Sequence, residues 1–313
     1  MKTRAFKQVD VFTDQAYFGN PLAVVMDASG LDDAAMQRFA AWTNLSETTF
    51  LLPPTNASAD YRVRIFTPDR ELNFAGHPTL GSCHSWLQAG GQPHSNDVVV
   101  QECKVGLVKI KRQAIDVGRH RQTFAAPSLT RAAISPVLLA QIAAALGLTA
   151  KQITATQALN NGLVWLGLLL DSPETVLQIT PDYQALGQLD VHVGVAGVYP
   201  ADGQPQLIAQ GSREARAFGP GGADNAAAPV FKPDVEVRGF VGSTRGYEDP
   251  VTGSLNASLA QWLMADGYAP ERYLASQGVC LGRAGQVHLE RDASGQVWVG
   301  GETVTCIDGS VTL

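Results

Sequence analysis

The sequence is poor in the features that mark several large classes of protein. Only 4 of its 313 residues are cysteines, and they are scattered without a CxxC pair, so neither a disulfide scaffold nor a zinc site is indicated. We expect each of them to be a small buried residue in a reduced, cytoplasmic protein. The four are Cys83, Cys103, Cys280 and Cys306.

Long apolar runs and an excess of positive charge are also missing. The longest apolar stretch, Leu163 to Leu170, is interrupted by Gly167 and falls far short of the ~20 residues that a membrane-spanning helix needs. Lysine and arginine total 23 against 29 aspartate and glutamate residues, a formal net charge of −6. We therefore expect no membrane partner and no nucleic-acid partner.

Cofactor motifs are absent as well. The chain has no GxGxxG after a strand, no Walker lysine and no GxSxG elbow. Five histidines show no metal-ligand spacing, namely His84, His94, His120, His192 and His288. The sequence thus predicts neither a metal nor a cofactor.

The composition that remains is that of an ordinary globular protein. Hydrophobic residues make up 45% of the chain, and the length favours two domains or one large one at ~150 residues per domain. Short strand-like runs dominate. Asp32 to Trp42 predicts a helix, as does Ser135-Pro136 with a closing Gly147. A boundary is predicted at Arg119 to Arg131, and a surface excursion at residues 216–233.

Two further predicted helices carry few charges, which indicates that protein surrounds them on most sides. One runs from Pro78 to about Gln88 and the other from Thr252 to about Asp266. Their starts are alike, since residues 78–82 and 250–254 share Pro, Gly and Ser at the same places. Because these starts lie about half a chain apart, we expect two similar domains, each with a sheet wrapped around one central helix.

Three polar clusters interrupt apolar surroundings, at residues 44–50, 74–79 and 247–254. With Phe18-Gly19-Asn20-Pro21, they resemble the PhzF-like (phenazine-biosynthesis) family of the diaminopimelate-epimerase fold superfamily. The resemblance starts at residues 9–13, continues through 64–68 and 277–283, and ends with 299–313. The segment 242–247, which precedes Glu248, is longer than the corresponding segment of this family. The resemblance therefore does not fix the geometry of the lid expected there.

The resemblance implies an α+β fold of two pseudo-symmetric domains, each a curved sheet or barrel wrapped around a central helix. We predict an N-terminal domain at residues 1–126 and a C-terminal domain at 127–299, with the strand 300–313 returning to the first. An exposed sheet edge makes a homodimer plausible, and the resemblance points the same way.

The resemblance also places a general acid/base at Glu47, and positions that contact substrate or assist proton transfer at His77 and Asp249. Enclosure by Leu45 and Phe50 would desolvate the Glu47 carboxyl and raise its pKa, so that it could both take and return a proton. Asp249 can also cap the helix that starts near Thr252.

Free amides at the two helix starts offer a site for a substrate carboxylate. These amides belong to Gly76, His77, Thr79, Thr252, Gly253 and Ser254, all of which except His77 are predicted to bind substrate. Asn20 is also predicted to bind substrate, and it is either a turn residue or lines the cleft. The predicted substrate-binding residues are thus Asn20, Gly76, Thr79, Thr252, Gly253 and Ser254.

The resemblance implies a cofactor-independent isomerase that acts on a small carboxylate, similar to trans-2,3-dihydro-3-hydroxyanthranilate isomerase. Racemases of the superfamily place a cysteine pair at the helix starts, and this chain has none there. Two alternatives stay open. One is an epimerase that uses Glu47 and Asp249 on opposite faces. The other is a non-catalytic small-anion-binding protein, which predicts an exposed Glu47 far from His77.

Overall fold

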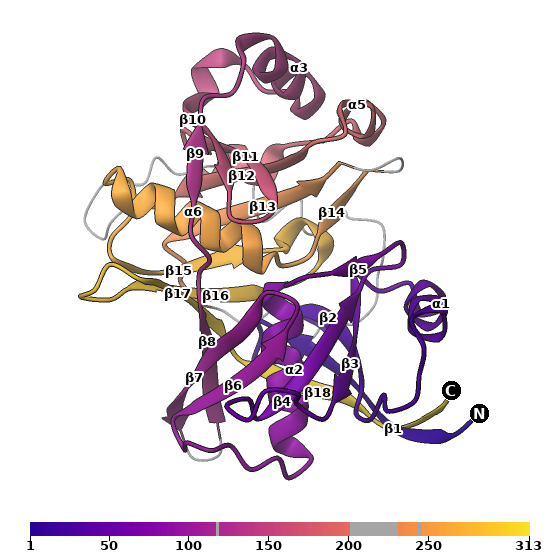
Figure 1. Cartoon of the computed structure of the whole chain (residues 1–313). Helices are drawn as coiled ribbons and strands as arrows, with labels where there is room; N and C mark the ends of the chain where they lie inside the picture. The colour runs from indigo at the N-terminus through magenta and orange to yellow at the C-terminus, as the bar shows by residue number, and fades with distance from the viewer. Residues whose placement is uncertain (117–118, 201–230, 243–245) are drawn as a thin grey trace, which may run out of the picture.

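The computed structural model describes residues 1–116, 119–200, 231–242 and 246–313. Most of the predicted surface excursion at 216–233 and part of the unusual segment 242–247 lie outside these residues. The described strands form one sheet of 18 strands, folded into two halves that lie one above the other in Figure 1. Within the same ranges, no helix is both long and apolar enough to cross a membrane.

The first half runs from the N-terminus to the end of β8. It contains β1 (Thr3–Val11), β2 (Asn20–Val25), α1 (Asp33–Thr43), β3 (Glu47–Leu52), β4 (Tyr61–Phe66), β5 (Glu71–Leu72), α2 (Gly76–Gln88), β6 (Val98–Cys103), β7 (Gly106–Asp116) and β8 (Arg119–Ala125).

The second half follows, and the last strand leaves it again. Its elements are β9 (Thr130–Ala132), α3 (Pro136–Leu146), η1 (Ala150–Gln152), β10 (Ile153–Asn160), β11 (Val164–Leu170), α4 (Pro173–Gln178), α5 (Tyr183–Leu189), β12 (His192–Val198), β13 (Val235–Val241), β14 (Tyr247–Asp249), α6 (Gly253–Ala265), β15 (Arg272–Gln277), η2 (Val279–Leu281), β16 (Gly285–Arg291), β17 (Val297–Gly301) and β18 (Thr303–Thr312).

The two halves repeat one pairing pattern. β2 runs parallel to β3, and β11 runs parallel to β12. β4 pairs with β5 and β6 as β13 pairs with β14 and β15, antiparallel to the first and parallel to the second. β17 joins β8 across the halves, and β18 pairs antiparallel with β1. The two chain ends therefore lie close together (Figure 1).

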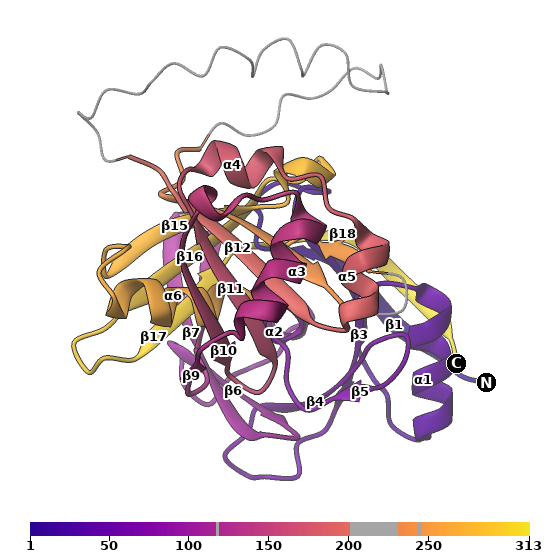
Figure 2. The same cartoon turned by 90° about the horizontal axis from the view of Figure 1, so that it is seen from above.

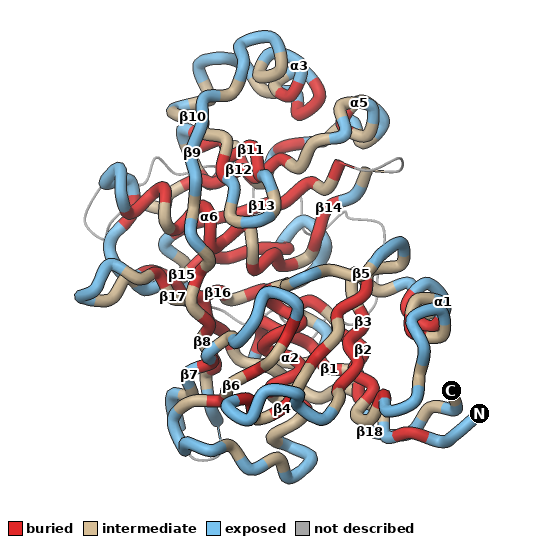
Figure 3. The backbone as a smooth tube through the Cα atoms, viewed as in Figure 1, coloured by how far each residue is buried: buried red, intermediate tan, exposed pale blue. Residues whose placement is uncertain are grey.

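Each half encloses one central helix. In α2, 9 of 13 residues are buried, and in α6, 10 of 13 are buried. Figure 3 shows the buried backbone concentrated in these helices and in the strands around them. The prediction of two helices surrounded by protein is confirmed, although α2 begins two residues earlier than expected, at Gly76.

The peripheral helices follow their local signals. The Asp32 carboxylate caps α1, and the Ser135 hydroxyl caps α3 ahead of Pro136. Gly147 closes α3 in the left-handed region, with φ of 68°. The helices α3, α4 and α5 lie on the side of the second half away from the first (Figures 1 and 2).

The predicted boundary at Arg119 to Arg131 contains the passage from β8, which ends the first half, to β9, which begins the second. One expectation is wrong, namely that all four cysteines are buried. Of the cysteines, Cys83 and Cys103 are buried, whereas Cys280 is exposed and Cys306 is half-buried. Cys280 lies in the exposed turn η2, where no core packs against it from both sides.

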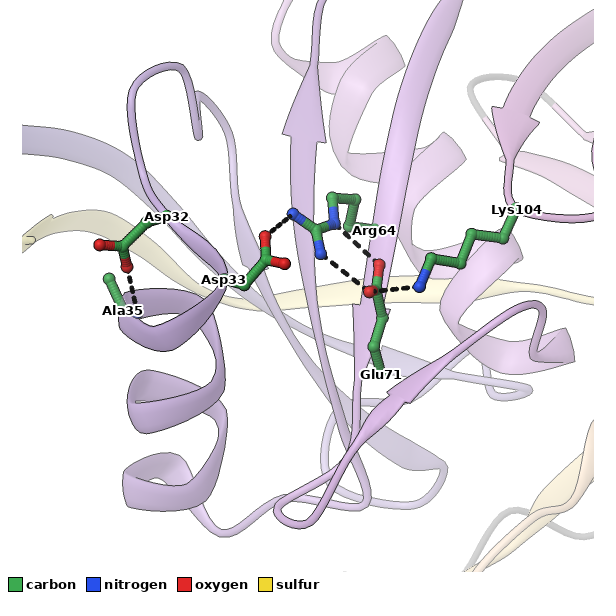
Figure 4. Close-up of polar contacts among 6 residues, drawn as sticks. All are labelled: Asp32, Asp33, Ala35, Arg64, Glu71 and Lys104. Carbon is green, nitrogen blue, oxygen red and sulfur yellow. Dashed lines mark hydrogen bonds and ion pairs between the residues drawn. The ribbon is translucent and has the colours of Figure 1, made fainter.

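An arginine–glutamate pair holds the hairpin before each central helix. Arg64 of β4 donates from Nε and Nη2 to Glu71 of β5, both at 2.8 Å. Arg238 of β13 pairs in the same way with Glu248 of β14, at 3.0 and 2.7 Å. Figure 4 shows the first pair, which also engages Asp33 and Lys104.

Candidate functional site

The two central helices meet at their N-termini. A Cβ atom built on Gly253 would lie 3.0 Å from the Cα atom of Gly76, and one built on Gly76 would lie 3.1 Å from the Cα atom of Gly253. At these distances a side chain would push the neighbouring backbone away, so glycine on both sides allows the helix starts to approach this closely. The first turns of α2 and α6 therefore form one continuous backbone surface between the halves.

The central helices also differ from the peripheral ones in their N-caps. A side-chain oxygen accepts from a backbone amide at the start of α1, α3, α4 and α5. The N-cap residues of α2 and α6, Ala75 and Thr252, provide no such bond. The first amides of these two helices are thus left for another acceptor, and two positive dipole ends point to one place. A carboxylate is the kind of group that such a place binds.

Not all of the predicted amides are open. The Thr79 amide donates to the Ala75 carbonyl at 3.2 Å, and the Thr252 amide donates to Gln277 Oε1 at 3.0 Å. The expectation of free amides is therefore wrong at Thr79 and Thr252. The Thr79 hydroxyl is engaged too, at 2.9 Å from the Ala75 carbonyl. The first-turn amides of Gly76, His77, Gly253 and Ser254 remain as candidates for binding an anion: these four positions are the first two residues of each central helix.

Glu47 begins β3 and faces the start of α2. Its Oε2 atom lies 3.2 Å from Nε2 of His77, and the two side chains are only 16% and 5% exposed. The alignment is not that of a hydrogen bond, and both atoms are buried without a partner among the residues described. These two side chains therefore form a closed acid–base pair at the uncapped end of α2.

Burial shifts the titration of this pair in opposite directions. It raises the pKa of Glu47 to about 8, and the negative charge of Asp249 adds to that effect. It lowers the pKa of His77 to about 3. At neutral pH the imidazole is thus uncharged, while the Glu47 carboxyl exists in both protonation states.

Asp249 ends β14 and is held on both of its oxygens. Oδ1 accepts from Asn20 Nδ2 at 3.1 Å, and Oδ2 accepts from the Thr252 hydroxyl at 2.6 Å. Burial raises the pKa of Asp249 to about 6, against the lowering effect of bonds from Thr252, Asn20 and Ser46. The expected cap of α6 by Asp249 is wrong, because the carboxylate binds the Thr252 hydroxyl and no backbone amide.

Asn20 connects the two halves at this point. Its amide group also donates to the Val251 carbonyl at 2.9 Å, so a first-half side chain fixes the segment between Asp249 and α6. Its own Oδ1 is buried without a partner in the described part of the chain. The structure thus brings Asn20, Glu47, His77 and Asp249 together where the two halves meet.

Gln277 is a residue of this site that the sequence analysis did not single out. Its Nε2 donates to the Asp249 carbonyl at 3.0 Å and to the Thr252 hydroxyl at 2.9 Å. Its Oε1 accepts from Asn256 Nδ2 at 2.8 Å. The available signal was the turn Gln277-Gly278, in which Gly278 has φ of 94°; a side chain that supports the site from the end of β15 gives no periodic pattern.

Other parts of the molecule offer less. A surface hollow of about 420 Å³ is lined by residues 54–57, Ala59, Asp60, Gln92 and His94. Its carboxylate, Asp60, is committed to the backbone amides of His94 and Val100, at 2.8 and 2.6 Å. Within the described ranges, no three His, Cys, Asp or Glu side chains gather as metal ligands would. The surroundings of Glu47 are therefore the best-supported candidate site.

Known proteins resemble this chain along its whole length. Residues 9–309 match the family described as phenazine biosynthesis-like protein, PhzC-PhzF. "Antisense-enhancing sequence 1" of Schizosaccharomyces pombe is 33% identical, with 99% of each chain covered. An uncharacterized isomerase of Mesorhizobium japonicum is 32% identical, with 100% of each covered. The trans-2,3-dihydro-3-hydroxyanthranilate isomerase of Pseudomonas fluorescens is 34% identical over 57% of this chain and 61% of its own.

Solved structures resemble the fold over its full length. A PhzF-family phenazine biosynthesis protein from Bacillus anthracis matches with a TM-score of 0.78 at 20% identity, covering 100% of both chains. A hydroxyproline epimerase from Agrobacterium vitis matches with a TM-score of 0.56 at 16% identity, over 99% of this chain and 91% of its own. The expected diaminopimelate-epimerase-like architecture is confirmed by these likenesses.

Proposed function

The chain belongs to the PhzC-PhzF family of phenazine biosynthesis-like proteins and is an isomerase, and we propose that it moves a proton between carbon atoms of a small carboxylate metabolite. Glu47 is the general acid and base of this reaction. The observation that carries the proposal is the pairing of a nearly enclosed Glu47 with His77, 3.2 Å apart, at the uncapped end of α2.

The reaction needs a base that is also an acid. With a pKa of about 8, roughly one tenth of Glu47 is ionised at pH 7. That fraction takes a proton from a substrate carbon, and the electron pair of the broken C–H bond enters the system conjugated with the carboxylate. The new Glu47 O–H then gives its proton to another carbon, and a double bond shifts between them.

The negative charge that develops on the substrate in this step is stabilised by the helix starts. The substrate carboxylate lies at the amides of Gly76, His77, Gly253 and Ser254, where fixed dipoles stabilise added negative charge without rearrangement. His77, an uncharged imidazole whose Nε2 lies 3.2 Å from Oε2 of Glu47, comes into hydrogen-bonding alignment with that oxygen as the carboxyl gains and loses its proton. Asp249 accepts from a substrate hydroxyl or amine, and its charge keeps Glu47 basic.

The contacts of Asp249 disfavour the epimerase alternative. A two-base epimerase needs two carboxyls that are free to exchange protons on opposite faces of one carbon. Both oxygens of Asp249 already accept hydrogen bonds, at 3.1 and 2.6 Å, whereas Oε2 of Glu47 has no hydrogen-bond partner among the residues described. The non-catalytic alternative predicts an exposed Glu47 far from His77, and the geometry contradicts that prediction.

The test is solvent exchange with the Glu47→Gln variant. Small carboxylates, including trans-2,3-dihydro-3-hydroxyanthranilate, are incubated in D₂O, and deuterium entry at carbon is followed by NMR and mass spectrometry. We expect the wild-type protein to label at least one of them, and E47Q to slow labelling by about 10²–10⁴-fold. Glu290→Gln, an exposed position, is the matched control. Undiminished labelling by E47Q would remove Glu47 from its role, and inversion at a single carbon would favour the epimerase.

A further inference from the structure

The second half has its own counterpart of Glu47, and it is His192. β3 and β12 are equivalent strands, each parallel to one neighbour and antiparallel to another. Phe66 lies opposite Thr48 in the first half, and Phe240 lies opposite Val193 in the second. The residue before each of these positions begins its strand, and these two residues are Glu47 and His192.

The starts of the central helices correspond in the same way. His77 is the second residue of α2, and Ser254 is the second residue of α6. In the first half Glu47 meets His77 directly. In the second half Trp165 lies between the two equivalent positions, since its ring is 5.3 Å from the His192 ring and its Nε1 donates to the Ser254 hydroxyl at 3.1 Å. His192 is thereby tied to the amide-rich surface where the helices meet.

The residues around Glu47 differ chemically from the equivalent residues around His192. Leu72 holds the register position of Asp249, because it lies beside Ile65 as Asp249 lies beside Gly239. Leu163, which precedes β11 by one residue, stands where Asn20 begins β2. Both leucines are half-buried and pack on the core. The surroundings of His192 thus have no carboxyl at the positions equivalent to Asp249 and Asn20. The second half therefore cannot carry out the proton transfer assigned to Glu47.

The imidazole of His192 has an unsatisfied hydrogen-bonding atom in the described structure. Its Nδ1 atom is buried with no hydrogen-bond partner among the described residues, as are Oε2 of Glu47 and Nε2 of His77. Burial lowers the pKa of His192; Asp190 acts against that effect, and Arg70, from the first half, adds to it. The ring is therefore uncharged at neutral pH, and one nitrogen donates while the other accepts.

We propose that His192, held by Trp165, is a specificity-determining residue that hydrogen-bonds a substrate hydroxyl on the side away from Glu47. This inference rests on the proposed function, because it assumes that the substrate carboxylate lies at the paired helix starts. Glu47 and His77 then act on the reacting carbons, and His192 selects which carboxylates are held correctly. The first half thus supplies the proton-transfer residues, and the second half supplies the residue that selects the substrate.

The experiment measures binding of benzoate and its 2-, 3- and 4-hydroxy derivatives by calorimetry. The proteins are the wild type, His192→Leu, His192→Gln and, as a control in the same half, His288→Leu, another histidine that burial makes harder to protonate. We expect one hydroxybenzoate to bind wild type roughly 3- to 10-fold more tightly than benzoate does. That gain should vanish in H192L, persist in part in H192Q and remain in H288L, while benzoate affinity changes less than about twofold.

Three results would overturn the inference. In the first, no hydroxybenzoate binds wild type more tightly than benzoate does; in the second, the tighter binding persists in H192L. In the third, H192L lowers the affinity for benzoate as much as the affinity for the hydroxybenzoate. The last would mean that His192 only supports the fold. Should H192L not fold, His192→Met is measured in its place against the same criteria. A wild-type protein that binds none of the four carboxylates, or labelling that survives in E47Q, defeats the proposed function itself. Failure of the His192 readout alone leaves that function standing.

Discussion

At the scale of single residues, the cost of keeping Glu47 buried should appear in the stability of the protein. Its pKa is near 8 in the folded chain against 4.5 ordinarily, so the folded state binds more protons than the unfolded state between these values. The free energy of unfolding therefore falls as pH rises from about 4.5 to 8. We predict that E47Q is more stable than wild type above pH 8, by a few kcal/mol at 1.36 kcal/mol per pKa unit.

Urea denaturation at pH 5, 7 and 9 measures this difference. Asp249 and Glu236, whose pKa values are also raised by burial, leave a residual slope in E47Q. The exposed substitution E290Q should reproduce the wild-type curve. Equal stabilities of E47Q and wild type at pH 5 and pH 9 would show that Glu47 titrates normally, and Glu47 would then be unsuited to the proposed proton transfer.

The site residues differ in how far the sequence reveals them. Glu47, His77 and Asp249 lie in polar clusters that interrupt apolar surroundings, and they were predicted together. Gln277 was not predicted, because a glutamine that satisfies a backbone amide and a carbonyl looks like any polar residue at a strand end. His192 was noted only as a histidine without metal-ligand spacing, since its equivalence to Glu47 exists only in the pairing of strands.

At the scale of elements, the two arginine–glutamate pairs allow a direct comparison of burial. The side chains of Arg238 and Glu248 are 4% and 1% exposed, against 21% and 13% for Arg64 and Glu71. Removing one partner of a fully buried pair leaves an uncompensated charge. We predict that Arg238→Met costs about 3–5 kcal/mol of unfolding free energy, and that Arg64→Met costs about 1 kcal/mol, since solvent screens that pair.

Chemical denaturation of the two variants provides the measurement. Arg238 also donates to the carbonyls of Val176 and Ile179, at 3.1 and 2.7 Å, so these contacts are part of its cost. The double variant R238M/E248L should recover most of the loss, because no charge is then left buried. Equal costs for R238M and R64M would mean that burial does not set the strength of these pairs.

Several elements escaped prediction for physical reasons. β8 was not predicted as a strand, because it begins with the polar residues Arg119, His120 and Arg121 and only alternate positions such as Phe124 are buried. β3 was assigned only as a polar cluster, because the polar residues at its start, Glu47 to Thr49, hide the apolar run that follows. The capped helices were easier, because their start and stop signals are local.

At the scale of the whole molecule, the duplication was visible only through the two alike helix starts. The strands that complete it share a pairing pattern with little shared sequence, and a pairing pattern cannot be read from single-strand periodicity. Segments far apart in sequence supply the closures: β18 joins β1, and β17 joins β8. These long-range pairings depend on the complete fold, so the sequence indicated the kind of architecture before it indicated the partners of each strand.

The closure by β18 provides a prediction for the whole chain. β18 pairs with β1 from Thr3 opposite Thr312 to Val11 opposite Thr303, and Lys7 bonds Asp308 at 2.5 Å. We predict that a chain ending at Glu302 loses on the order of 5 kcal/mol, at about 0.5–1.5 kcal/mol per lost hydrogen bond, and self-associates through the open edge of β1.

Urea denaturation and sedimentation velocity test both parts of this prediction against the full-length chain. Asp308→Asn keeps β18 and weakens only the ion pair between the Lys7 side chain, which is 7% exposed, and a carboxylate that is 65% exposed, so it should cost less than the truncation and leave the chain unassociated. If the shortened chain matched the full-length protein in both measurements, β18 would be dispensable, and the first half would be stable without the strand that returns to it.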